Sequence, residues 1–195
     1  GCGSGCFAHA LSGRCHVVGV DLTPDVAKNS SVDAAIVADL GRLPFADNCV
    51  TLCFSKYVLE HLENPGAVFS EVARVLRPGG VFLFHTPNRF HYVPIIARLL
   101  PYGLHRRINA ARGRNEADTF VTFYRANSPG AIRRLAQRAG LGVESLLTLE
   151  SKPNYLVFSK LAYLAGIAYE RLVNRFDFLA PLRVNIFGVL RKPKV

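Results

Sequence analysis

The pattern of hydrophobic and polar positions predicts short strands that alternate with helices. Short runs of β-branched and aromatic residues are typical of buried strands. Residues 65–76 instead repeat apolar side chains every three or four positions, as one face of a helix requires, and the Pro-Gly-Gly run at 78–80 ends that pattern. We expect strands at 16–20, 34–37, 50–54, 81–84, 141–149 and 185–190, and helices that begin at Pro24, Pro65 and Pro129.

Residue types that commonly cap helix ends support two of these predicted helices. Thr23 precedes Pro24, and Ser128 precedes Pro129, so each helix has an N-cap residue followed by a proline in its first turn. Gly140 ends the second of them. Strands that alternate with helices predict an α/β fold with a doubly wound, mainly parallel, Rossmann-like sheet, and the length fits a single domain over residues 1–195.

Two stretches interrupt the alternation of strands and helices, and we expect them to determine substrate specificity. Residues 89–127 are basic and aromatic and would form a lid, because long loops in compact domains are usually functional. Residues 151–182 form a helical insertion before the last strand. Within it, residues 155–173 are apolar apart from Lys160, Glu170 and Arg171. We expect this helix to be buried against the domain or in a homodimer, with contact to a membrane surface as the second interpretation.

Composition narrows the class of protein. Half of the residues are hydrophobic and 19% are charged, which excludes disorder as the main state. The net charge of +10 is uneven: the first 88 residues hold 6 Lys and Arg against 8 Asp and Glu, and the remainder hold 18 against 6. A membrane surface, a phosphate-bearing substrate, nucleic acid, or merely a solvated basic face would fit the second half. The cysteine spacing predicts no metal site, and reduced thiols favour a cytoplasmic location.

Candidate chemistry lies where the predicted strands end. Ligands of open parallel sheets bind beyond the carboxyl ends of the strands. A glycine-rich turn at residues 1–5 would let the backbone approach a ligand closely. Asp21 and Asp39 end two successive strands, and Asp39 is followed by apolar residues that could enclose a planar base. These features together describe a nucleoside pocket along one edge of the sheet.

The sequence here resembles a known family. Its motifs are GCGSG at 1–5, VGVD at 18–21, ADLGRLPFADNCV at 38–50, VLEHLENP at 58–65 and EVARVLRPGGVFLFHTPN at 71–88. They resemble the class I S-adenosylmethionine-dependent methyltransferases, most closely the small-molecule enzymes of that class. The resemblance implies that family's fold, its cofactor S-adenosylmethionine, and methyl transfer as the activity.

The resemblance also implies roles for residues in the first two motifs. Gly1, Gly3 and Gly5 would pass under the methionine and ribose part of the cofactor. Asp21 would bind the ribose hydroxyls, and Leu22 would lie against the adenine.

Later motifs complete the implied cofactor site. Asp39 would accept a hydrogen bond from the adenine amine, the Leu40 backbone would meet a ring nitrogen, and Ser55 would lie near the methionine end. The family's strand order, 3-2-1-4-5-7-6, places a first strand at the centre of the sheet. We expect that strand and the acidic residue that ends it to precede Gly1, and therefore a gap between the strands at 16–20 and 50–54.

Methyl transfer is an in-line displacement for which a protein mainly supplies alignment and desolvation. A general base is needed only when the acceptor must lose a proton. Candidates by residue type and expected position are His61, His85, His91 and Tyr124, although each histidine could equally be structural.

Three functional hypotheses remain. The first is methyl transfer to a small or lipid-like acceptor by a cytoplasmic enzyme, peripheral at the membrane in one variant. The second is methylation of nucleic acid, although Ser55-Lys56-Tyr57-Val58 stands where such enzymes carry an Asn-Pro-Pro-aromatic tetrapeptide. The third is a non-catalytic relative that binds the cofactor or a partner, which the intact Asp21 and Asp39 disfavour.

Overall fold

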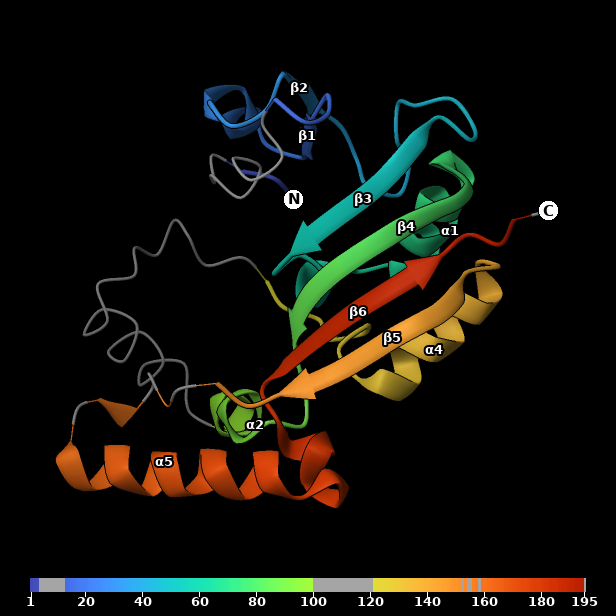
Figure 1. The fold of residues 1–195 in the computed structure, drawn as a ribbon. Coiled ribbons are helices and arrows are strands. Elements are labelled where there is room, and N and C mark those ends of the chain that lie inside the picture. The colour runs from blue at the N-terminus through green and yellow to red at the C-terminus, as the bar shows by residue number, and fades with distance from the viewer. Residues whose placement is uncertain (4–12, 100–120, 152, 154–155, 158, 195) are drawn as a thin grey trace.

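The computed structural model describes residues 1–3, 13–99, 121–151, 153, 156–157 and 159–194. Expectations for Gly5 and for residues 100–120 therefore lie outside the described residues. Two sheets are present (Figure 1). The larger sheet has the strand order β3-β4-β6-β5, and the smaller one pairs β1 with β2. The strands are β1 (Val18–Asp21), β2 (Ala34–Val37), β3 (Val50–Lys56), β4 (Leu76–Pro87), β5 (Gly142–Leu149) and β6 (Asn185–Arg191).

The mainly parallel α/β fold predicted from the sequence is confirmed. β1 pairs with β2, and β3 with β4, in parallel, whereas β6 runs antiparallel between β4 and β5. β1 and β3 are not hydrogen-bonded to each other, so the gap predicted between these two strands is present. β4 is longer than predicted, because pairing with both β3 and β6 extends it in both directions from residues 81–84.

Two helices cover one face of the larger sheet: α1 (Pro65–Val75) and α4 (Pro129–Arg138). Phe69 of α1 and Phe82 of β4 meet edge to face, with ring centroids 5.8 Å apart, in a core that also buries Ile132 of α4. Full burial of a side chain of this size contributes roughly 1.5–3 kcal/mol to stability. The helices therefore hold β4 and its carboxyl end in a fixed position.

The helix caps differ in one case from the prediction. Ser128 caps α4 as expected, because its hydroxyl accepts a hydrogen bond from the Ala131 N–H (3.3 Å). The helix expected after Pro24 is only the short 3-10 helix η2 (Pro24–Lys28). Thr23 does not cap it, since its hydroxyl donates to Asp21 instead.

The opposite face of the larger sheet is exposed over the described residues. Its strands turn apolar side chains toward solvent, although the other face is buried under α1 and α4. The exposed residues are Leu52, Phe54, Leu147, Leu149 and Phe187.

Further helices lie at the end of the sheet to which β4 and β5 run (Figure 1). They are α2 (Tyr92–Leu99), α5 (Lys160–Arg175) and the 3-10 helix η6 (Asp177–Leu182). The expectation that the helix at 155–173 is buried against the domain needs correction, because only Gly166 and Val173 of α5 are buried, whereas its burial in a homodimer stays a prediction. Among the described helices, none has both the length and the apolarity needed to cross a membrane.

Candidate active site

Asp21 ends β1 and is already partly saturated with hydrogen bonds. Its Oδ1 accepts from the Thr23 N–H (2.9 Å) and the Thr23 hydroxyl (3.0 Å), and its Oδ2 accepts from the Gly3 N–H (2.9 Å). Burial opposes ionisation, but the Thr23 and Gly3 donors, together with the positive charge of the Gly1 amine 3.6 Å away, lower the pKa of Asp21. A carboxylate offers about four acceptor positions. Oδ2 therefore keeps capacity for a hydroxyl of a ligand.

The first glycines bring the backbone between the end of β1 and the segment that follows β3. Gly3 has a φ of +51°, a conformation that favours glycine, and a Cβ there would point into open space. A Cβ on Gly1 would clash with Cγ2 of Val58. Residue types other than glycine would therefore fit poorly at either position, and the backbone of residues 1–3 lies beside the Asp21 carboxylate.

The predicted base-binding residues lie on neighbouring turns. Leu22 is 67% exposed directly after Asp21, so it can form an apolar wall. Asp39 follows β2 and is also exposed, and its Oδ1 accepts from the Gly41 N–H (2.8 Å). Leu40 packs against the hydrophobic core. Because β1 and β2 are adjacent and parallel, Asp21 and Asp39 share one edge of their sheet.

The carboxyl end of β3 carries an orphaned polar atom. The Oγ of Ser55 is buried and has no hydrogen-bond partner within the described structure. Tyr57 follows the strand with a φ of +56°, which is unusual for a bulky residue, and its N–H donates to the His85 carbonyl (2.9 Å). Backbone strain of this kind persists where surrounding contacts enforce it, often at functional sites.

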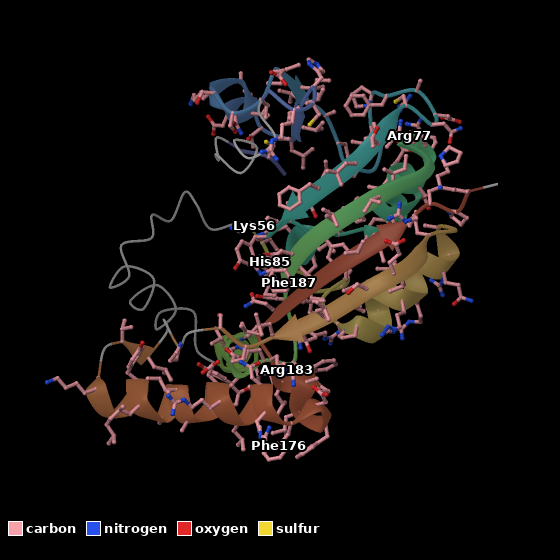
Figure 2. All side chains as sticks on the ribbon, in the orientation of Figure 1. Lys56, Arg77, His85, Phe176, Arg183 and Phe187 are labelled. Carbon is pink, nitrogen blue, oxygen red and sulfur yellow. The ribbon has the colours of Figure 1, made fainter. Side chains whose placement is uncertain are left out.

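His85 lies at the carboxyl end of β4 between two aromatic rings. The ring centroids of Tyr57 and His85 are 4.5 Å apart. The Phe187 ring is stacked on His85, with centroids 4.3 Å apart (Figure 2). Its Nε2 is 2.8 Å from Oδ1 of Asn185. Because an amide oxygen only accepts, Nε2 carries the proton and Nδ1 keeps a lone pair. Burial, with the Lys56 charge adding to it and the Asn185 bond opposing it, lowers the pKa of His85, so the ring is neutral at neutral pH.

A buried polar network lies behind this cluster. The Asn127 amide donates to the Thr86 hydroxyl (2.6 Å), which donates to the Glu60 carboxylate (3.1 Å). The Glu60 carbonyl accepts the N–H groups of Phe123 and Tyr124 (2.8 and 3.1 Å). These hydrogen bonds therefore fix the backbone at Phe123 and Tyr124, near the C-terminal end of residues 89–127.

The other predicted bases are placed differently from His85. His61 directs Nδ1 at the Val121 carbonyl (2.8 Å). His91 is 1% exposed, with Nε2 3.3 Å from the Glu150 carboxylate, so it joins α2 to the end of β5. Tyr124 has a φ of +53° beside Glu60. Of the four candidates, His85 is the one that stacks between Tyr57 and Phe187 at the carboxyl end of β4.

Known proteins resemble both the sequence and the fold. The family model described as a methyltransferase domain matches residues 1–84. A malonyl-acyl-carrier-protein O-methyltransferase of Yersinia pestis is 37% identical over 92 residues, which cover 44% of this chain and 34% of that protein. Over this part, the chain is similar to class I S-adenosylmethionine-dependent methyltransferases.

More distant relatives extend the likeness along the chain. A ubiquinone biosynthesis O-methyltransferase of Thiobacillus denitrificans is 28% identical over 173 residues, which cover 78% of this chain and 67% of that protein. A solved methyltransferase structure from Mesorhizobium loti superposes with a TM-score of 0.62 at 19% identity, covering 98% of this chain and 88% of the other. The match to the Yersinia relative spans about a third of that relative's length.

The residues present fit the cofactor of this methyltransferase family. Asp21 retains acceptor capacity, Gly3 leaves open space above its backbone, and the buried Ser55 hydroxyl lacks a partner. An orphaned buried hydroxyl is costly unless something satisfies it.

Sequence reasoning missed Tyr57, Asn185 and Phe187 as parts of the site. A positive φ at Tyr57 leaves no mark in the sequence, and Asn185 and Phe187 reach His85 only through the pairing of β4 with β6.

Proposed function

We propose that this protein transfers a methyl group from S-adenosylmethionine to an oxygen or nitrogen of a small or lipid-like acceptor. S-adenosylmethionine, when bound, supplies an electrophilic methyl group on a neutral leaving group. The observation that carries the choice of acceptor atom is the 2.8 Å contact from Nε2 of His85 to Oδ1 of Asn185, which favours the tautomer whose Nδ1 can take a proton. Two relatives named O-methyltransferases support the same choice.

Each end of the proposed site has its own task. Asp21 would hold the ribose hydroxyls, with Gly3 beneath the chain of the cofactor and Leu22 and Asp39 at the base. Ser55 would bind near the methionine end. These residues mainly align the reactants, which supplies most of what a methyl transfer needs.

His85 would act at the acceptor. An acceptor hydroxyl or amine must lose a proton as its bond to the methyl carbon forms, and Nδ1 of the neutral imidazole can receive that proton. The rings of Tyr57 and Phe187 would border a flat or apolar acceptor.

The test is a transfer assay with S-adenosylmethionine that carries a labelled methyl group. Purified full-length protein is mixed with a solvent extract of bacterial lipids and quinone precursors, with RNA, and with buffer alone. We expect label in the organic extract only. Label in RNA would favour the nucleic-acid hypothesis, and measurable cofactor binding without any transfer would favour a non-catalytic relative.

Residues 155–173 bear on how such an acceptor is reached. We propose that this segment meets a partner, since half of the residues of α5 are exposed. A membrane surface and a second copy of the chain are the two partners that the sequence predicts for it.

A further inference from the structure

The outer side of α5 and η6 is apolar although it is exposed. Leu161 is 79% exposed, Leu164 is 62% exposed, and Phe178 of η6 is 77% exposed. We call this surface the outer face. It comprises Val157, Lys160, Leu161, Leu164, Arg171, Leu172, Arg175, Phe176 and Phe178, all of them exposed.

Packing on the inner side fixes which way α5 faces. Gly166 fits closely against the preceding turn, since a Cβ there would lie 2.5 Å from Cβ of Pro153. Val173 is 1% exposed, and the Tyr169 hydroxyl donates to the Leu182 carbonyl (2.8 Å). The exposed leucines are therefore held outward by a firmly attached helix.

The C-terminal end of α5 is held as well. The buried guanidinium of Arg183 donates from Nε to the Val173 carbonyl (2.8 Å) and from Nη2 to the Phe176 carbonyl (3.4 Å). Cationic donors at a helix C-terminus satisfy its last carbonyls and oppose its dipole. Asn174 adds two hydrogen bonds to the backbone of Glu150 at the end of β5.

Charge on the outer face is mainly positive, although Asp177, between Phe176 and Phe178, is 99% exposed. Lys160, Arg171 and Arg175 are exposed along α5 and, at 3.6 residues per turn, border the line of Leu161, Leu164 and Leu172. The acidic residues nearby are occupied: Glu170 accepts from the Asn174 amide (2.8 Å) and Asp177 accepts from Arg183 (3.0 Å). Leucine and phenylalanine side chains edged by cations are the pattern of helices that lie in the plane of a membrane surface.

We propose that the outer face docks on the surface of an anionic lipid bilayer. The leucines and phenylalanines enter the boundary between headgroups and acyl chains, and the basic side chains extend to lipid phosphates. Figure 1 shows α5 at the end of the sheet to which β4 and β5 run. Docking in this orientation brings that end of the sheet, where His85 lies, toward the bilayer.

The docking itself is independent of the proposed function. Only the idea that a lipid-like acceptor reaches His85 from the bilayer rests on it. Binding to vesicles is therefore measured without cofactor or acceptor, so that loss of docking and loss of methyl transfer are separate results.

The experiment is flotation of the full chain with vesicles of phosphatidylcholine, alone or mixed with phosphatidylglycerol. We expect binding that needs phosphatidylglycerol and weakens with salt. R171Q/R175Q should lower the partition coefficient about fivefold for each charge, from about 1 kcal/mol per basic residue converted at 1.4 kcal/mol per tenfold. L161Q/L164Q should lower it at least as much.

Matched controls carry the same changes elsewhere. R133Q/R134Q removes two exposed arginines of α4, and L147Q replaces an exposed leucine of the open sheet face. Both should bind vesicles like the unchanged chain. All positions are exposed, and thermal melts monitor folding.

Two results would overturn the proposal. The first is that the substitutions in α5 and the matched control substitutions reduce vesicle binding equally. The other is concentration-dependent dimerisation in sedimentation velocity, abolished by L161Q/L164Q, in a chain that does not float with either vesicle, since a second copy would then cover the outer face.

Discussion

At the end of β1 the site is built by residues close together in the sequence, whereas at the ends of β3 and β4 it is built by residues far apart. Asp21 is bound by Thr23 two positions away and by Gly3 eighteen positions away. His85 is bound by Asn185, one hundred positions away. The first arrangement uses backbone donors and would recognise a constant cofactor. The second uses side chains and would recognise the acceptor, which differs among relatives.

The largest expected effect is on cofactor affinity, through Asp21 at the end of β1. In Asp21→Ala, affinity for S-adenosylhomocysteine, measured by calorimetry, should fall about 100-fold, since hydrogen bonds to a charged group contribute about 1.5–3 kcal/mol each. Asp25→Ala, which removes an exposed carboxylate from η2, is the matched control and should bind normally. Unchanged affinity in a folded Asp21→Ala protein would contradict the role of the β1 end.

The next change acts on the acceptor end. His85→Asn should lower kcat about 100-fold or more for an oxygen or nitrogen acceptor, because the proton acceptor is lost, and should leave cofactor affinity unchanged. Since the pKa of His85 is lowered from 6.5, the rate of the unchanged protein should rise with pH only below pH 6.5 and stay flat above it.

The control for this change is His16→Asn, at an exposed histidine. A normal kcat in His85→Asn would show that the acceptor needs no base. A weakened cofactor affinity would show that the two ends are not separable.

These two ends also mark what the sequence could reveal. Gly3 and Asp21 belong to short local motifs, and Ser128 caps α4 through a residue only three positions away. The strand order and the gap between β1 and β3 followed from the family resemblance. His85 could be named only as one of four candidates, because its tautomer depends on Asn185 and its stacking on Phe187, and both contacts exist only once β6 has paired with β4.

The sequence also could not predict which side of α5 is exposed or where the backbone is strained. The apolar sequence pattern of residues 155–173 is the same whether its leucines face a core or solvent. The close fit of Gly166 on Pro153 in the structure shows which side of α5 is covered. Likewise, nothing in the sequence marks the positive φ of Tyr57.

A smaller effect would refine the acceptor end. The Asn185 bond raises the pKa of His85 against burial, so Asn185→Ala should shift the acid limb of the rate profile to lower pH and reduce kcat about tenfold by freeing the ring. Asn185→Asp places a carboxylate on Nε2 and should shift the limb to higher pH. Opposite shifts identify a positioning residue, whereas identical shifts in the two variants would indicate general damage to β6.

The smallest effect concerns the network behind both ends, which should govern stability without belonging to either. Burial raises the pKa of Glu60 from 4.5, despite its own backbone N–H, His61 and Thr86 acting in the other direction. The folded state thus favours the protonated carboxyl, and stability is lost as pH rises through that raised pKa.

Glu60→Gln avoids this loss while its amide oxygen can still accept from Thr86. In urea unfolding it should be more stable than the unchanged protein by on the order of 1 kcal/mol at neutral pH and equal to it below pH 4.5. Glu63→Gln, at an exposed position, is the matched control. If Glu60→Gln were instead less stable at neutral pH, the ionised carboxylate would be a net stabilising member of the network, and the chain at Phe123 and Tyr124 would depend on its charge.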